Sequence, residues 1–153
     1  MQMKTDDSNT KPLSKWLLPL ILVLLGSGCS TVEKGKRYGD APLKTFKTAY
    51  VVMTQTANWD IGMYIREALA DRGVDVTAGR MQDKPANVAF YVTYVDRRKW
   101  DVAMYLDSLE IQFSDGATGK LLASGSFRNR FFHSFPNERQ KTIEVINTMY
   151  EAK

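Results

Sequence analysis

The side chains that could carry out metal chemistry are few and far apart in this sequence. His133 is the only histidine and Cys29 the only cysteine. A zinc site of the usual type takes three or four ligands from histidine, cysteine and carboxylate groups. One histidine and one distant cysteine do not supply that set, so we predict no metal and no cofactor. We expect His133 to be a packing residue in an aromatic loop.

The serines and carboxylates also lack the spacing of a catalytic site. The Gly-x-Ser-x-Gly turn is absent, and the nearest string, 123–126 (Ala-Ser-Gly-Ser), reads as strand. No phosphate-binding loop or dinucleotide fingerprint occurs. Asp107 and Glu110 lie three residues apart, which in a regular strand puts them on opposite faces and separates them for acid–base work. We therefore predict no catalytic residues and a protein that is not an enzyme.

A basic and aromatic cluster is the main candidate for binding. Arg97, Arg98, Lys99 and Trp100 are consecutive, and Tyr105 follows. Cations beside an indole can hold an anionic partner by bidentate contacts and stacking, and lipopolysaccharide phosphate, peptidoglycan carboxylate or an acidic protein loop would suit. The alternative is a hydrated hairpin tip whose charges prevent edge-to-edge aggregation.

The run 128–132 (Arg-Asn-Arg-Phe-Phe) is a second candidate contact. Exposed phenylalanines would mark a binding patch there, whereas burial under the last helix would give them a packing role.

Periodicity along the chain predicts the elements that hold these residues. Alternating or β-branched runs predict strands, and apolar residues at helical spacing predict helices. The expected strands are 48–54, 74–77, 87–96, 103–114 and 121–128, and the expected helices are 59–72 and a final helix from 137. The order β-α-β-β-β-β-α predicts an α+β fold, a mainly antiparallel sheet with two helices packed on it.

Local signals refine these boundaries. Asn58 and Asn137 are expected N-caps, Gly73 is expected to end the first helix, and Gln140 would complete a capping box with Asn137. Four residues, Ile143, Ile146, Met149 and Tyr150, are the expected buried stripe of the last helix.

Two interruptions are expected in the strands. The charges of 97–99 are expected to break the strand before Trp100, and the alternation fails near 106–108, which predicts a β-bulge. The residues 115–120 (Asp-Gly-Ala-Thr-Gly-Lys) predict a tight turn between the last two strands.

The beginning of the chain has the layout of an export signal. Lysines precede an apolar run, Trp16 to Leu25, and small residues follow it. As a helix this run covers about 15 Å, against a hydrocarbon core of about 30 Å. Pro19 also disfavours a longer helix. We therefore expect a removable signal, residues 1–28, and not a membrane-spanning helix.

The residues that end this signal resemble a known processing motif. The string 25–29 (Leu-Gly-Ser-Gly-Cys) resembles the lipobox of bacterial lipoproteins, although Gly26 stands where an aliphatic residue is usual. The resemblance implies that Cys29 carries S-diacylglycerol and an N-acyl chain, including palmitate. Ser30 after the cysteine resembles the outer-membrane case, which places the protein on the periplasmic face. The alternative is an ordinary signal with an incidental cysteine.

Removal of the signal would leave 125 residues, enough for one domain with a core. Its net charge of about +3 is too small and too scattered to predict a nucleic-acid partner. Glycines, a proline and charges without apolar periodicity predict a flexible lipidated tether over 29–43. We expect a single α+β domain over 44–153.

Taken together, these features resemble a family of small Gram-negative outer-membrane lipoproteins. The resemblance rests on the lipobox, the single domain, 97–101 (Arg-Arg-Lys-Trp-Asp), 105–106 and the turn 118–120. The element order is also similar, at the level of fold only, to the lipoprotein of the lipopolysaccharide-assembly complex. These resemblances imply a non-catalytic, lipid-anchored envelope protein that serves as a periplasmic binding or assembly module at the outer membrane. Its partners would be the membrane and an envelope protein or an anionic glycan or lipid. The alternative is an enzyme, or an enzyme accessory, acting on cell-wall or envelope glycan.

Overall fold

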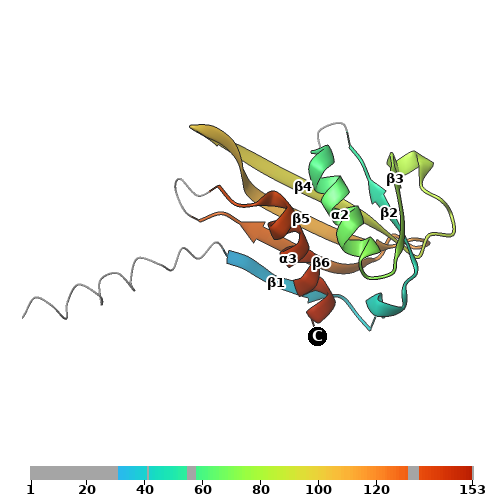
Figure 1. The fold of residues 1–153 in the computed structure, drawn as a ribbon. Coiled ribbons are helices and arrows are strands. Elements are labelled where there is room, and N and C mark those ends of the chain that lie inside the picture. The colour runs from blue at the N-terminus through green and yellow to red at the C-terminus, as the bar shows by residue number, and fades with distance from the viewer. Residues whose placement is uncertain (1–30, 41, 55–57, 131–134, 153) are drawn as a thin grey trace, which may run out of the picture.

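A computed structural model describes residues 31–40, 42–54, 58–130 and 135–152. Its centre is a six-stranded mixed sheet in the order β1-β6-β5-β4-β2-β3. Two helices, α2 and α3, lie side by side on one face of this sheet (Figure 1). The α+β class and the two packed helices predicted from periodicity are thus confirmed.

The strands are β1 (Thr31–Arg37), β2 (Thr48–Val52), β3 (Asp75–Gly79), β4 (Phe90–Asp101), β5 (Ala103–Asp115) and β6 (Leu121–Arg128). The helices are α2 (Trp59–Ala70) and α3 (Glu138–Glu151), and short 3₁₀ turns occupy Leu43–Thr45 and Met81–Asp83. No helix in the described ranges has the length and apolar character needed to cross a bilayer.

The pairing of the strands divides the sheet into two parts. Neighbours from β1 through β6 and β5 to β4 are antiparallel. The pairs β4–β2 and β2–β3 are parallel, and α2 is the crossover between β2 and β3. The β4–β5 hairpin is the longest unit and extends past the other strands at one end (Figure 1).

The core fills the space between the sheet and the helices. Phe90, Phe113 and Phe127 are fully buried there, and the rings of Phe90 and Phe113 lie 5.0 Å apart. Gly125 gives α3 room, because a Cβ at that position would lie 2.9 Å from Val145 Cγ1. Burial of these side chains supplies the main driving force of folding.

The buried stripe of α3 differs from the expected one. The structure buries Thr142, Val145, Ile146 and Met149, whereas Ile143 and Tyr150 are only partly buried. The helix is rotated because it rests on the glycines of β1 and β6. Thr142 is tolerated inside because its hydroxyl donates to the Glu138 carbonyl at 2.8 Å.

The segment expected to be a flexible tether forms an edge strand instead. Thr31–Arg37 is β1 and pairs antiparallel with β6. Val32 packs against the core, and Gly35 lies so close to α3 that a Cβ would meet the Thr148 carbonyl carbon. Because a valine and a glycine supply the helix-facing contacts, the segment has no apolar alternation from which a strand could be predicted.

The charged residues 97–99 do not break their strand. β4 continues through them to Asp101, because backbone pairing with β5 does not depend on side-chain charge and the side chains can reach water or counterions. The expected bulge is present: Arg97 pairs with Ser108 but Arg98 pairs with Leu106, so Asp107 is the extra residue.

The helix signals are largely confirmed. The Asn58 side chain accepts from Asp60 N at 3.0 Å, and Asn137 accepts from Gln140 N at 2.9 Å. The reciprocal half of the capping box is absent, because the Gln140 side chain donates to Glu144. Gly73 has a φ of 74° after α2, the conformation for which glycine was expected.

Candidate functional site

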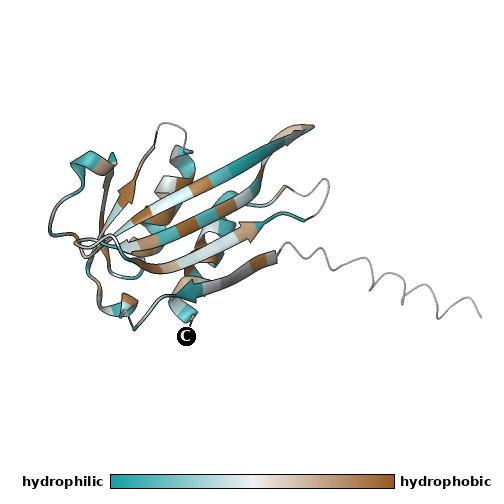
Figure 2. Ribbon diagram, turned by 180° about the vertical axis from the view of Figure 1, so that it is seen from behind, coloured by the Kyte–Doolittle hydropathy of each residue, from teal (hydrophilic) through white to brown (hydrophobic). Residues whose placement is uncertain are grey.

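The sheet face turned away from the helices is uncovered over β1, β6, β5 and the outer part of β4 (Figure 2). Over β2 this face is covered, because Tyr50 and Val52 are buried together with Val88. Side chains alternate between the two faces of a strand, so the residues beside the buried ones point to this open face. In the uncovered part they include Val95 and Arg97 of β4, Ser108, Glu110 and Gln112 of β5, Ser124, Ser126 and Arg128 of β6, and Lys36 of β1. The open face is therefore polar and carries several cations.

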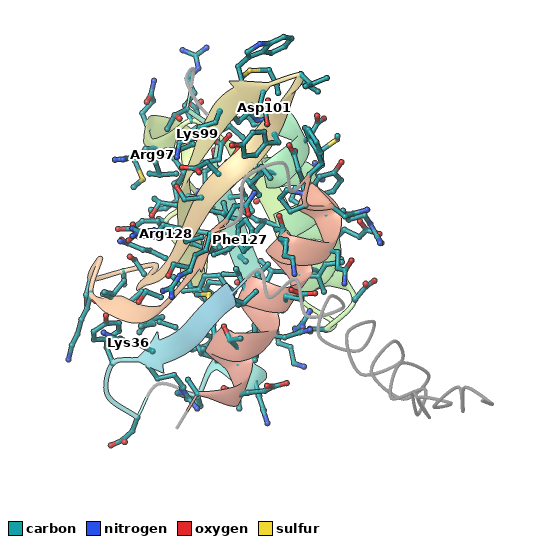
Figure 3. The ribbon with its side chains drawn as sticks, turned by 90° about the vertical axis from the view of Figure 1, so that its left-hand side faces the viewer. Lys36, Arg97, Lys99, Asp101, Phe127 and Arg128 are labelled. Atoms are coloured by element: carbon teal, nitrogen blue, oxygen red, sulfur yellow. The ribbon has the colours of Figure 1, made fainter. Side chains whose placement is uncertain are left out.

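Strand register aligns these side chains in rows across the sheet. Arg97 pairs with Ser108, and Ser108 pairs with Arg128, so two arginines flank one serine. Adjacent strands are about 4.8 Å apart, which places the two arginine backbones roughly 10 Å apart. Figure 3 shows Arg97, Arg128 and Lys36 projecting from the same side of the sheet.

A shallow depression of about 550 Å³ lies among these residues. Lys36 and Tyr38 lie toward one end of it, where the Tyr38 hydroxyl is 3.3 Å from Ser124 Oγ. Glu110 is the acidic residue of its lining and accepts from Gln112 Nε2 at 2.8 Å. Cations outnumber carboxylates here, so the depression favours an anionic ligand.

The strand places the predicted contact residues, Arg97 to Trp100, in different surroundings. Arg97 lines the depression, but Arg98 points to the helix side and its Nη2 contacts Glu138 Oε2 at 2.7 Å. Burial alone would lower the pKa of Arg98, but the hydrogen bond and charge of Glu138, with the charge of Asp96, raise it. Arg98 therefore serves as a tie between β4 and α3.

The next two members of the cluster reach the end of the hairpin. Lys99 Nζ contacts Asp107 Oδ1 at 2.9 Å, and Trp100 is exposed near the tip. The structure thus brings Arg97 together with Arg128 and Lys36, and separates it from Arg98 and Trp100.

Asp107 and Glu110 do not form an acid–base pair, although the reason differs from the predicted one. The bulge at Asp107 breaks the strict alternation on which the opposite-face prediction depended. Asp107 is held by Lys99, and Glu110 is held by Gln112. Over the described residues, no cluster of three or more metal-ligating side chains is found.

Several predicted residues lie outside the described ranges. Cys29, the signal 1–28, His133 and the phenylalanines of 131–132 are among them. Ser124 is described and lies on the open face of β6 as a strand residue.

Lys36 and Arg128 line the depression because of strand pairing, which the sequence does not reveal. The sequence places Lys36 in the predicted tether, and it places Arg128 in the run that leads to the phenylalanines. The alternation of Ser124, Ser126 and Arg128 with buried neighbours was the available signal for one polar face.

The fold defines a class of small α+β domains with two helices on one face of a mixed sheet. It is similar to PelC of Paraburkholderia phytofirmans, solved as a dodecamer in two crystal forms. One form, a single-residue variant, has a TM-score of 0.55 and 17% identity, and the other has 0.52 and 15%. In both cases the match covers 80% of this chain and 98% of PelC. Neither family models nor curated protein sequences match the chain.

Proposed function

We propose that the protein is a lipid-anchored, non-catalytic module of the bacterial envelope, held on the periplasmic face of the outer membrane. The export-signal pattern and Cys29 support the anchor. The module binds an acidic envelope polysaccharide through the depression on its open sheet face.

The row of Arg97, Ser108 and Arg128 is the observation that carries this proposal. A guanidinium group forms paired hydrogen bonds to a carboxylate, and hydroxyl side chains between the arginines can bond to sugar hydroxyls. The residues of the depression come from β1, β6, β5 and β4, so it extends across several strands. An extended polymer with repeated carboxylates fits this surface better than a small compact metabolite.

Self-association is the second part of the proposal. PelC was solved as a dodecamer, and we extend assembly from like copies to this chain. In the described part of the chain, the outer edges of β1 and β3 have no strand partner, so they are available to neighbouring copies. Light scattering of the detergent-extracted lipoprotein should give the mass of a closed oligomer, and a monomer at all concentrations would refute assembly.

The alternative of an enzyme or enzyme accessory uses the same surface differently. Hydrolysis of a glycosidic bond usually needs two carboxyl groups on either side of the bond. Among the residues that line the depression, Glu110 is the carboxylate, and Gln112 already engages it. We expect the bound polysaccharide to keep its chain length, which size-exclusion chromatography of the polymer would check.

Binding to polygalacturonate, with neutral dextran as comparison, tests the polysaccharide proposal. The double variant Arg97→Gln/Arg128→Gln should bind polygalacturonate at least tenfold more weakly, a loss of about 1.4 kcal/mol. The matched control Lys44→Gln/Arg66→Gln removes two exposed cations outside the depression and should bind as wild type. Equal losses in both variants would indicate net-charge attraction alone and would contradict the proposed site.

A further inference from the structure

The tip of the β4–β5 hairpin exposes an apolar surface. Trp100 is 72% exposed, Val102 85% and Met104 52%. Trp100 and Met104 are cross-strand partners, and Val102 alone connects the two strands. The hairpin that carries these side chains extends past the other described strands at this end of the sheet (Figure 1).

The backbone at this tip has a strained conformation, and the residue that adopts it is apolar. Val102 has a φ of 52°, the left-handed region, which glycine, asparagine and aspartate adopt far more readily than a β-branched residue. A polar turn residue would relieve the strain and remove the exposed apolar surface together. Strained conformations cluster at functional sites, so the exposed Val102 is a candidate for a functional role.

Strand register locates the tip relative to the start of the described chain. Thr31 pairs with Arg128, Arg128 with Ser108, and Ser108 with Arg97, so these residues lie at one level of the sheet. The strand continues four residues beyond Arg97 to Asp101. At about 3.3 Å per residue, the tip extends roughly 13 Å past the beginning of β1.

The anchor in the proposed function lies at this same end. Cys29 precedes Thr31 by two residues, which span at most about 7 Å. The tip therefore extends roughly 6 Å farther than the connection to the acylated cysteine can reach, when the strands stand along the membrane normal. Apolar faces of interfacial proteins bury about 5–10 Å into the headgroup and acyl boundary.

We propose that the apolar tip formed by Trp100, Val102 and Met104 inserts into the interface of the bilayer that holds the acyl chains of Cys29. This inference rests on the lipid anchor in the proposed function. The tip is a second contact that fixes the orientation of the domain, because one anchor point leaves it free to tilt.

The residues behind the tip fit a phospholipid surface. Lys99 lies one residue before Trp100, and its side chain is 62% exposed (Figure 3). Basic residues just outside an inserted apolar tip lie at the level of anionic headgroups. The indole of Trp100 prefers the membrane interface, because it combines an apolar ring with a polar N–H. The occupant of the tip is therefore a phospholipid bilayer that contains anionic lipid.

Fluorescence of a dye at the tip tests the insertion directly. Loss of binding is a poor readout, because three acyl chains hold the protein on the membrane whatever the tip does. We would label Val102→Cys with an environment-sensitive dye in the acylated lipoprotein, whose only native cysteine would be blocked by lipid. The control is Thr118→Cys, exposed in the turn at the opposite end of β5.

The labelled proteins are reconstituted in vesicles of phosphatidylethanolamine and phosphatidylglycerol, with and without brominated acyl chains. Dye at position 102 should shift to the blue and be quenched at least twofold by brominated lipid, and dye at position 118 should do neither. A blue shift without quenching would show that the tip contacts protein, and no change would show that it is in water; either result overturns the inference.

Palmitate labelling of cells separates failure of the tip from failure of the anchor. Palmitate on Cys29 with an unquenched tip would overturn only the inference. If no palmitate is found, the anchor is refuted, and the same dye variants carrying Cys29→Ser are presented to the vesicles. Quenching at position 102 would then still support the tip as a membrane contact, and its absence would refute both.

Discussion

At the scale of single residues, Val102 lowers the stability of the fold through its backbone strain while it exposes an apolar side chain at the hairpin tip. We predict that Val102→Asn raises the free energy of unfolding by about 1 kcal/mol, because asparagine tolerates the left-handed region that valine resists. Urea denaturation measures the change. Val95→Asn, at an exposed and extended position of β4, should give no gain. An unchanged Val102→Asn protein would show that the turn carries no strain.

Gly35 is a residue whose side chain is excluded by packing alone. A Cβ there would lie among the backbone atoms of Thr148 and Met149, which cannot move without shifting α3. We predict that Gly35→Ala lowers the free energy of unfolding by about 2 kcal/mol, within the range for overpacked sites. The neighbouring exposed substitution Lys36→Ala should change it by less than about 0.5 kcal/mol. Equal small effects would mean that α3 does not rest on β1.

Tyr94 gives the protein a dependence on alkaline pH. Burial, followed by the charge of Asp96, raises the pKa of Tyr94 to about 12, and its hydroxyl donates to the Asn58 carbonyl at 3.1 Å. A raised pKa means that the folded state keeps a proton that the unfolded state has lost. The stability that this proton contributes is complete below the usual tyrosine pKa of about 10 and falls as pH rises from there toward 12.

We predict that Tyr94→Phe flattens this alkaline loss, because phenylalanine has no proton to lose. Urea midpoints measured between pH 8 and pH 12 test it, with Tyr38→Phe at an exposed position as control. A wild-type loss that persists unchanged in Tyr94→Phe would assign the dependence to other groups.

At the scale of elements, the ion pair between Arg98 and Glu138 connects β4 to α3. Both side chains are partly buried, at 28% and 22% exposed, so water screens them less than a surface pair. A double-mutant cycle of Arg98→Ala and Glu138→Ala should give a coupling of about 1 kcal/mol. A coupling near zero would show that the contact does not hold the helix to the hairpin.

Elements with their own pattern were predictable from the sequence, and those defined by their neighbours were not. β4 and α2 carry a clear period, and the failed alternation near Asp107 located the bulge. β1 has no such pattern, because Gly35 is needed for close approach and the rest of its pairing is backbone. The rotation of α3 also depends on glycines in two other elements.

The candidate site follows the same division. Arg97 could be selected by residue type, as a cation beside an aromatic residue. Its neighbours in space, Arg128 and Lys36, come from strands whose order and register the sequence does not state. Sequence spacing therefore grouped Arg97 with Arg98, whereas the strand places these two side chains on opposite faces.

At the scale of the whole molecule, the sheet has distinct surfaces with distinct proposed roles. The helices cover one face, and the other face is open over β1, β6, β5 and part of β4 (Figures 1 and 2). Cations outnumber carboxylates around the depression on that face, and one end of the sheet combines the start of β1 with the apolar hairpin tip. A membrane anchor at that end would leave the open face accessible from the side. This arrangement suits a module that is held by lipid and binds a polymer along its sheet.

Acylation of Cys29 is the claim on which this arrangement depends. Labelling cells with radioactive palmitate, followed by membrane fractionation, tests it in wild type and in Cys29→Ser. We predict label on the wild-type protein in the outer-membrane fraction and none on the Cys29→Ser protein. Wild-type protein that is exported without taking up palmitate would contradict the account.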